Sequence, residues 1–215
     1  MNIISINIVS PARVSLDGGP NKVRSGYFKL PVAQSVFLDY QGFEGDGVGN
    51  IKIHGGDDKA VCAYCTEHFP YWADKLLREI LPGSFGENLS LLGMLETEVN
   101  IGDIFEMGAA KVQVSQPRQP CFKLNKVFKD QSMACSVKTT GFSGYYFRVL
   151  KPGLVEPDSL VKIIKKGSFS IEKANALLRK GGSNAEQMQE LISLSDLSDD
   201  WRGMLQKRLN RLNSD

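Results

Sequence analysis

The sequence predicts a mainly β, barrel-like domain with a few helices, followed by a small all-α bundle of three helices. Apolar and polar residues alternate with the period of a β-strand over the first two thirds of the 215 residues. Glycine-rich turns separate these short segments, and the periodicity becomes helical after Gly167. Closely spaced strands favour a barrel or a sandwich over alternating βαβ units. We therefore divide the chain into two domains, 1–166 and 167–215.

The predicted strands are bounded by glycine, proline or aspartate. They are Ile3 to Val9, Ser35 to Leu38, Ile104 to Met107, Lys111 to Ser115 and Leu160 to Ile164, with turns at 17–20, 45–47, 54–56 and 82–83. One helix is expected to interrupt them. From Glu67 to Ile80 the apolar residues recur at helical spacing, so this helix is predicted to pack its apolar face on the sheet.

The segment 168–213 is predicted to form three short helices. Gly181-Gly182 ends the first, because glycine is favoured just after a helix. Ser183-Asn184-Ala185-Glu186 is a capping-box pattern that opens the second helix at Asn184. The third helix follows Ser198. Chains of about 40 residues are near the lower limit of independent stability, so the bundle is expected to lean on the β-domain or on a partner.

The composition is that of a soluble globular protein, with 42% hydrophobic and 23% charged residues. From Lys165 onward lie 9 of the 26 basic and 7 of the 24 acidic residues, which leaves 17 of each before it. Nucleic-acid binders carry a basic face, so no nucleic acid is expected as a partner. No stretch approaches the roughly 18 apolar residues that span a bilayer, and no export signal begins the chain. We expect a cytoplasmic protein, away from membranes, with reduced cysteines.

Two cysteines, Cys62 and Cys65, form a Cys-x-x-Cys pair that is followed by His68. Such a pair indicates either a zinc site or dithiol redox chemistry. A structural zinc site needs four ligands, and no second pair of suitable spacing exists in the sequence. The redox motif normally lies in a βαβ unit, which is not predicted here. We therefore interpret Cys62 as a small buried core residue.

Cys121 lies in a different context, the segment Gln116-Pro117-Arg118-Gln119-Pro120-Cys121. The two prolines fix φ and remove backbone donors, so this loop is stiff and suits the presentation of one sulfur atom. Arg118 and Lys123 favour the thiolate, which is the form that acts as a nucleophile or as a ligand of a soft metal. A buried structural cysteine is the alternative, and these residues by themselves do not decide between the two.

A second candidate segment is His54-Gly55-Gly56-Asp57-Asp58-Lys59. Its glycines let the backbone approach a ligand closely, and Lys52 and Lys59 suit an anionic group such as a phosphate. The segment lacks the Gly-Lys-Ser/Thr ending of a Walker loop, and a tight β-turn explains it as well. Phe85-Gly86-Glu87-Asn88-Leu89 and Ile101-Gly102-Asp103 are similarly open to two interpretations, a pocket wall or a turn.

Taken in order, five motifs resemble those of the MOSC domain family, which is named for the C-terminal domain of molybdenum-cofactor sulfurase. They are Gly42-Phe43-Glu44-Gly45-Asp46, His54 to Val61, Gly86-Glu87-Asn88-Leu89, Gly102-Asp103 and Gln116 to Cys121. The resemblance is to the stand-alone bacterial branch, whose members carry a C-terminal three-helix domain, and residues 168–213 fit that pattern too. It implies a β-barrel-like domain that binds the molybdenum cofactor (molybdopterin), a pterin-dithiolene with a terminal phosphate.

By this resemblance Cys121 is the catalytic residue and the metal ligand. His54, Lys59, Asn88, Gln116 and Arg118 become candidates for binding the cofactor, and Arg118 is our choice for an anion because its planar fork can donate two hydrogen bonds. One position departs from the pattern of the mitochondrial reductases of the superfamily. They carry Arg immediately before the cysteine, whereas this chain has Pro120, so the phosphate contacts cannot be transferred directly.

The implied activity is reduction of small N-hydroxylated compounds, such as hydroxylaminopurines, by a molybdenum oxidoreductase. No Gly-x-Gly-x-x-Gly fingerprint for a flavin or nicotinamide is present, so the electrons are expected to come from a separate redox donor protein. A sulfur carrier with a persulfide on Cys121 is the alternative, and a non-catalytic cofactor-binding module is a third possibility. The family is also described as binding pyridoxal phosphate. A monomer or a homodimer is expected.

Overall fold

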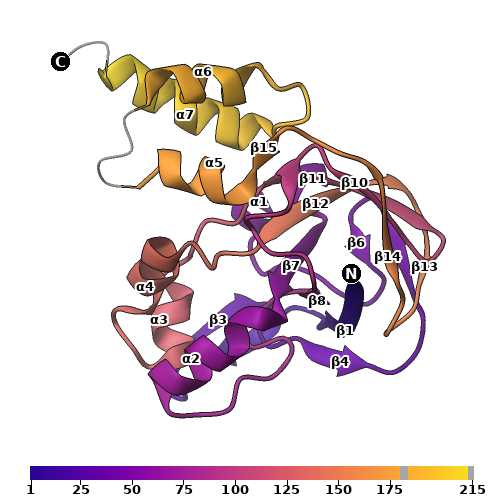
Figure 1. The fold of residues 1–215 in the computed structure, drawn as a ribbon. Coiled ribbons are helices and arrows are strands. Elements are labelled where there is room, and N and C mark those ends of the chain that lie inside the picture. The colour runs from indigo at the N-terminus through magenta and orange to yellow at the C-terminus, as the bar shows by residue number, and fades with distance from the viewer. Residues whose placement is uncertain (180–183, 213–215) are drawn as a thin grey trace.

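The computed structural model describes residues 1–179 and 184–212. Its main element is a curled mixed sheet of eight strands in the order β14-β10-β11-β12-β7-β8-β1-β4 (Figure 1). The strands are β1 (Asn2–Ile8), β4 (Leu30–Val32), β7 (Val61–Cys65), β8 (Leu89–Leu92), β10 (Ile104–Met107), β11 (Ala110–Pro117), β12 (Tyr145–Lys151) and β14 (Val161–Lys165). Neighbours run antiparallel, except β7 and β8, which are parallel.

Smaller elements surround this sheet. The short strands are β2 (Ala12–Ser15), β3 (Lys22–Ser25), β5 (Val36–Asp39), β6 (Gly42–Phe43), β9 (Asn100–Ile101), β13 (Gly153–Val155) and β15 (Phe169–Ser170). The helices of this part are α1 (Ile51–His54), α2 (Phe69–Leu76), α3 (Lys123–Phe128) and α4 (Met133–Thr140), with 3-10 turns η1 (Asp57–Lys59) and η2 (Thr66–His68). Figure 1 shows α2, α3 and α4 together at one side of the sheet.

The sheet curls far enough for its first strand to reach the residues that precede its last. Asn2 forms an isolated antiparallel bridge with Leu160. The amide of Ile3 donates to the carbonyl of Ser159 at 3.0 Å, and the amide of Val161 donates to the carbonyl of Met1 at 2.9 Å. Pairing of this kind removes exposed sheet edges. The predicted barrel-like, mainly β domain is therefore confirmed.

The three predicted C-terminal helices are also confirmed, as α5 (Ile171–Leu177), α6 (Ala185–Ser193) and α7 (Asp199–Leu212). They lie against one end of the sheet, at the top of Figure 1. Their buried side chains, including Leu177, Leu191 and Trp201, belong to the same apolar cluster as the strands. A second cluster lies beneath α2, α3 and α4 and contains Trp72 and Phe85. No helix in the described part of the chain is long and apolar enough to cross a membrane.

The helices next to the strands differ from the prediction. The helix expected over Glu67 to Ile80 ends at Leu76, because Leu77 adopts the left-handed conformation with a φ of 50°. Ile80 is nevertheless buried in the second cluster. The expectation of a single helix was wrong, because α3 and α4 follow directly after Cys121. These two helices are short, so their periodicity is too brief to distinguish them from loop.

The cap of α6 also differs from the prediction. Asn184 is the N-cap residue, and its side-chain oxygen accepts from the amide of Gln187 at 2.9 Å. The helix therefore begins one residue later than the capping-box pattern indicated, because Asn is as good an N-cap as Ser. Ser183 and Gly181-Gly182, which carried the rest of that prediction, lie outside the described residues.

Trp201 provides a test of how strongly α7 is held to the sheet. Its indole Nε1 donates to the carbonyl of Pro117, the last residue of β11, at 2.9 Å, and its ring is fully buried. Trp201→Phe should lower the free energy of unfolding by about 1–3 kcal/mol, because that carbonyl loses its shorter hydrogen bond and keeps only the 3.5 Å one from Gln116 Nε2. Urea unfolding measures the change. Met204→Ala, at a partly exposed position of α7, should change it by less than about 0.5 kcal/mol, and equal losses in both variants would contradict this account.

Candidate functional site

A cavity of about 420 Å³ gathers segments that lie far apart in the sequence. Its walls come from residues 24–29, 41–49, 51–62, 85–88 and 118–124, together with Tyr146 on β12. This volume lies within the range of pockets for small ligands and cofactors. The glycines of the motifs His54 to Val61 and Gly86 to Leu89 lie on this wall, where they leave room for a ligand next to the backbone.

Cys121 lines this cavity and is half-buried. It follows β11 by a short loop and precedes α3, where the amide of Leu124 donates to the Cys121 carbonyl at 3.0 Å. The loop is thus held between a strand and the first turn of a helix. A thiol in this position is both fixed by its backbone and accessible from the cavity, as a metal ligand or a nucleophile requires.

Arg118 is the buried cation of the same loop. Its backbone amide donates to the carbonyl of Gly144 at 3.0 Å, and its Nη2 donates to the carbonyl of Phe85 at 2.6 Å. Among the described residues no salt bridge involves Arg118. Burial raises the pKa of the nearby Glu87 carboxyl, while hydrogen bonds with its own backbone, Ser90 and Gly83 act to lower it. Because no described carboxylate forms a salt bridge with it, the Arg118 guanidinium lines the cavity without a bound counterion.

His54 and Lys59 also line the cavity. Burial, and next the cations Lys123, Arg118 and Lys59, together lower the pKa of His54 to about 4. Its imidazole is therefore neutral at pH 7. The Lys59 ammonium donates to the carbonyl of Ile53 at 3.1 Å and pairs with Asp200 of α7 at 2.5 Å. The C-terminal helices thus reach one of the predicted site residues directly.

The other two predicted cofactor residues, Asn88 and Gln116, differ in position, since only Asn88 lines the cavity. Asn88 lines the cavity, but its side chain accepts from the amide of Cys62 at 3.1 Å and donates to Asp46 at 2.8 Å, so it also holds the wall together. Gln116 is buried and is not among the residues that line this cavity. Its Oε1 has no hydrogen-bond partner among the described residues. Four of the five candidates, with Cys121, are therefore brought together.

Several lining residues were not predicted. Arg24 and Lys29 add positive charge, although Lys29 is paired with Asp46. Lys123, which was expected to act on the Cys121 thiol, also lines the cavity. Tyr146 faces the cavity beside Cys62, its register partner across β12 and β7. Burial raises the pKa of both the Tyr146 hydroxyl and the Cys62 thiol, so both keep their protons at neutral pH. Only the register of two distant strands brings them together, and no local motif carries that signal.

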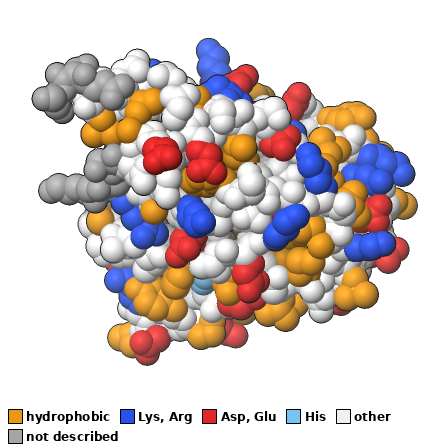
Figure 2. Space-filling model, turned by 45° about the horizontal axis from the view of Figure 1, so that its top comes forward, with side chains coloured by type: hydrophobic (Ala, Val, Ile, Leu, Met, Phe, Trp, Pro, Cys, Tyr) orange, Lys and Arg blue, Asp and Glu red, His pale blue; other side chains and the backbone are white. Residues whose placement is uncertain are grey.

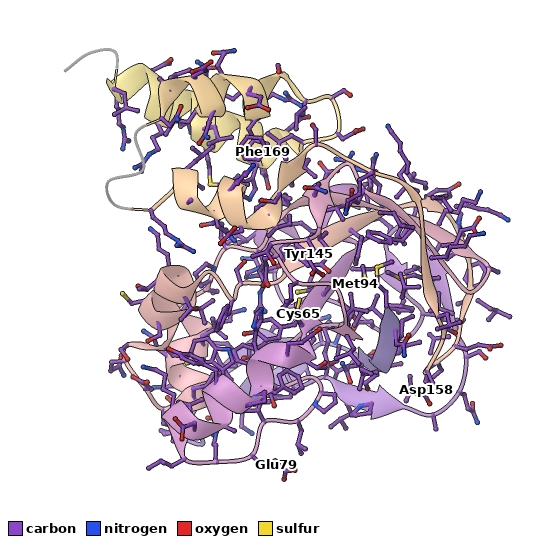
Figure 3. The ribbon with its side chains drawn as sticks, in the orientation of Figure 1. Cys65, Glu79, Met94, Tyr145, Asp158 and Phe169 are labelled. Atoms are coloured by element: carbon purple, nitrogen blue, oxygen red, sulfur yellow. The ribbon has the colours of Figure 1, made fainter. Side chains whose placement is uncertain are left out.

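The two cysteines of the Cys-x-x-Cys pair do not act together. Both belong to β7, and residues three apart on a strand point to opposite faces. Cys62 is buried as expected, on the side of the cavity, whereas Cys65 lies in the interior near Met94 and Tyr145 (Figure 3). Burial, and next the nearby Glu96 carboxylate, raise the pKa of the Cys65 thiol. The pair can neither close a disulfide nor bind one metal together.

The buried Glu96 carboxylate is connected to the Cys121 loop through Gly144. Glu96 Oε1 accepts from the amide of Gly144 at 2.8 Å, and the carbonyl of Gly144 accepts from the amide of Arg118. Asn175 of α5 donates to the hydroxyl of Ser143 at 2.9 Å, so the C-terminal helices hold the same turn from the other side. The position of the loop therefore depends on three parts of the chain.

Comparisons with known proteins identify the family of this chain. Residues 50–162 match the family described as "MOSC domain", and residues 170–212 match the "YiiM-like, 3-alpha helix domain". The YflK protein of Bacillus subtilis (strain 168) is 39% identical over 98% of this chain and 96% of its own length. The crystal structure of YiiM from Geobacillus stearothermophilus has a TM-score of 0.82 at 39% identity, covering 96% of this chain and 98% of that one.

A more distant relative is a protein of Gibberella moniliformis (strain M3125 / FGSC 7600) that bears the name "Reductase". It is 31% identical over 74% of this chain, but the match spans only 29% of that longer protein. The shared fold, the ordered motifs around one cavity and the matched C-terminal helices all lead to the same assignment. The chain belongs to the MOSC domain family and carries the YiiM-like 3-alpha helix domain at its C-terminal end.

Proposed function

We propose that this protein is a molybdenum-cofactor-dependent oxidoreductase that reduces N-hydroxylated compounds, with Cys121 as the metal ligand. The observation that carries the proposal is the accessible Cys121 thiol in a cavity whose Arg118 is buried without a carboxylate partner. The name of the Gibberella moniliformis relative supports a reductase. Membership of the MOSC family supports the cofactor.

The residues of the cavity fit a cofactor of this chemistry. A thiolate is a soft ligand suited to molybdenum that is already bound by dithiolene sulfurs. Arg118, Lys59 and Lys123 offer three cationic side chains for the terminal phosphate, and His54 offers a neutral imidazole for a pterin hydrogen bond. When bound, the cofactor would supply the two-electron redox chemistry that protein side chains lack.

The chain's own residues would then position the substrate and exclude water. Reduction of an N–OH group to N–H and water consumes two electrons and two protons. The electrons would come from a separate donor protein, since the sequence has no flavin or nicotinamide fingerprint. Tyr146 holds a proton on its hydroxyl at the cavity wall, because burial raises its pKa. In the proposed complex that hydroxyl would donate a hydrogen bond to the oxygen of the substrate.

Nucleic acid is not part of the proposal. Figure 2 shows basic and acidic side chains interspersed over the face it draws, rather than a continuous basic surface. Neutralising the phosphate backbone requires such a surface. The cations named here lie in the cavity, where they suit one small anionic ligand.

Replacing the proposed metal ligand tests the function. In a host that makes the cofactor, the purified protein should contain about one molybdenum per chain and should reduce a hydroxylaminopurine with an artificial reductant. Cys121→Ala should lose both the metal and the activity. Elemental analysis and a reduction assay measure these. Cys135→Ala, which removes an exposed thiol outside the cavity, is the matched control and should keep both.

Two other outcomes would overturn the proposal. Protein without molybdenum that carries a cyanide-labile sulfur on Cys121 would assign the chain to sulfur transfer instead. Protein loaded with the cofactor that leaves hydroxylamine substrates untouched would make it a binding module. Bound pyridoxal phosphate, the other ligand described for the family, would be detected by visible absorption of the purified protein and would also count against the proposal.

The charge of the cavity can be tested by the titration of His54. Its pKa of about 4 in the cofactor-free chain lies below the unperturbed value of about 6.5. Its stabilising contribution is therefore complete above pH 6.5 and is lost as the pH falls through about 4. The chain has 2 histidines, so NMR resolves the titration directly. Lys123→Gln should raise the midpoint, whereas Lys126→Gln, outside the cavity, should not. A midpoint near 6.5 in the unmodified chain would contradict this electrostatic account.

A further inference from the structure

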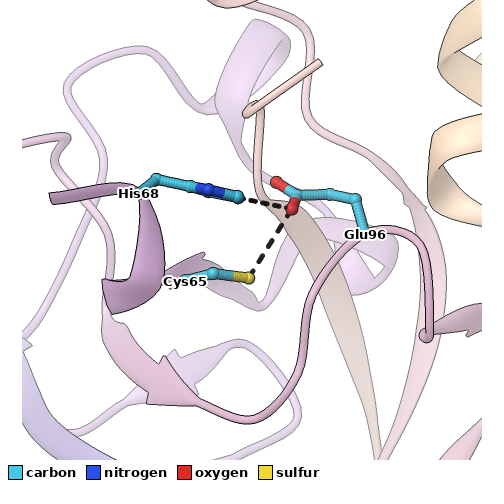
Figure 4. A group of neighbouring side chains, drawn as sticks. All are labelled: Cys65, His68 and Glu96. Carbon is cyan, nitrogen blue, oxygen red and sulfur yellow. Dashed lines mark hydrogen bonds and ion pairs between the residues drawn. The ribbon is translucent and has the colours of Figure 1, made fainter. Parts of the chain in front are cut away.

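Three metal-binding side chains meet in the interior, away from the cavity. Cys65 ends β7, His68 ends the following turn η2, and Glu96 comes from the loop after β8 (Figure 4). One donor atom from each lies within 4.8 Å of the other two. All three side chains are buried. None of them lines the proposed cofactor site.

Each donor atom of this cluster already has a partner. His68 Nε2 lies 2.7 Å from Glu96 Oε2, and Cys65 Sγ lies 3.7 Å from the same oxygen. Cys65 Sγ also lies 3.0 Å from the carbonyl of Met94. The cluster as it stands is therefore a hydrogen-bonded one, in which protons on sulfur and nitrogen occupy the space between the donors.

The two separations to Glu96 Oε2 lie within about 1 Å of those in a tetrahedral zinc site. Bond lengths of about 2.3 Å to sulfur and about 2.0–2.2 Å to nitrogen and oxygen place sulfur and oxygen ligands about 3.6 Å apart, and nitrogen and oxygen ligands about 3.4 Å apart. The Cys65 to Glu96 distance of 3.7 Å already matches. The His68 to Glu96 distance of 2.7 Å must grow by less than about 1 Å.

We propose that Cys65, His68 and Glu96 form a structural zinc site, with the Met94 carbonyl as the fourth ligand. Thiolate, imidazole and carboxylate are the ligand types that zinc takes. One thiolate and one carboxylate also offset the two charges of the ion, so the buried site is neutral overall. Because the site has four protein ligands and no access for substrate, its role is structural rather than catalytic.

The surroundings of the cluster hold its ligands in place. The His68 ring stacks on Phe142 with centroids 3.8 Å apart, which fixes its plane. Glu96 Oε1 accepts from the amide of Gly144 at 2.8 Å, which leaves Oε2 for the metal. Such outer contacts orient ligands in metal sites and tune their affinity. Since Gly144 also holds Arg118, zinc here would stabilise the turn behind the Cys121 loop.

The test reads metal binding and does not depend on the proposed activity. The full chain carrying Cys121→Ala, which removes the cavity thiol, is produced in zinc-supplemented medium and analysed for zinc. The same chain is then unfolded, freed of metal, and refolded with Co²⁺. Thiolate ligation of Co²⁺ gives a charge-transfer absorption in the near ultraviolet. We expect about one metal per chain, this absorption, and a Tm higher by roughly 5 °C or more than that of the metal-free chain.

Single substitutions added to the Cys121→Ala chain identify the metal ligands. Cys65→Ala should abolish the absorption, and Glu96→Gln should weaken Co²⁺ binding at least tenfold. Cys62→Ala, on the opposite face of the same strand, is the matched control and should change neither. A refolded parent chain with neither stoichiometric metal nor the absorption would overturn the proposal and leave a hydrogen-bonded cluster. So would an absorption that survives Cys65→Ala. The metal content and absorption of the Cys121→Ala chain test the proposal even if a further variant fails to fold.

Discussion

The two peptide groups of Gly144 connect the parts of this molecule that matter for function. Its amide donates to the buried Glu96 carboxylate, and its carbonyl accepts from Arg118. The backbone there has a φ of 68°, and a Cβ would stand 2.1 Å from the carbonyl oxygen of Ala63. A side chain cannot be accommodated at that distance. The pairing of β12 with β7, the interior polar cluster and the loop of Cys121 therefore all require glycine at one position.

Charge is distributed unequally between the interior and the cavity. The interior carboxylates are bound by donors: Glu87 by the amides of Gly83 and Phe85 and the Ser90 hydroxyl, and Glu96 by His68 and Gly144. Arg118, by contrast, has only carbonyl acceptors in its hydrogen bonds to the described residues. A buried charge without a directly bonded counterion is costly. An anionic ligand in the cavity would offer the Arg118 guanidinium such a bonded counterion.

The sequence was most informative where the signal is local. Alternation predicted β1, β5, β10, β11 and β14 but missed β7, β8 and β12 within the main sheet, and apolar spacing after Gly167 predicted the three helices. The short motifs located four residues of the cavity wall and Cys121, because two of the motifs are turns whose glycines allow close approach to a ligand and a third is a loop stiffened by prolines. The sequence was uninformative where a contact depends on residues that are far apart in the chain. Tyr146 meets Cys62 only through strand register, and Glu96 meets Cys65 and His68 only through the path of a loop. Gln116 belongs to a matched motif and still lies off the cavity wall.

The pairing of the first strand has a consequence for how the chain reaches its fold. Asn2 and Ile3 take Ser159 and Leu160 as partners, and β1 pairs with β8 in the middle of the chain. During synthesis β1 can pair with β4 and then with β8, but Asn2 and Ile3 must wait for residues 159–161 before the sheet closes. Contacts between such distant residues slow folding because the intervening loop must be closed first. Closure of the sheet therefore belongs to the slow, non-local part of folding, whereas the pairing of β1 with β4 joins segments close in sequence.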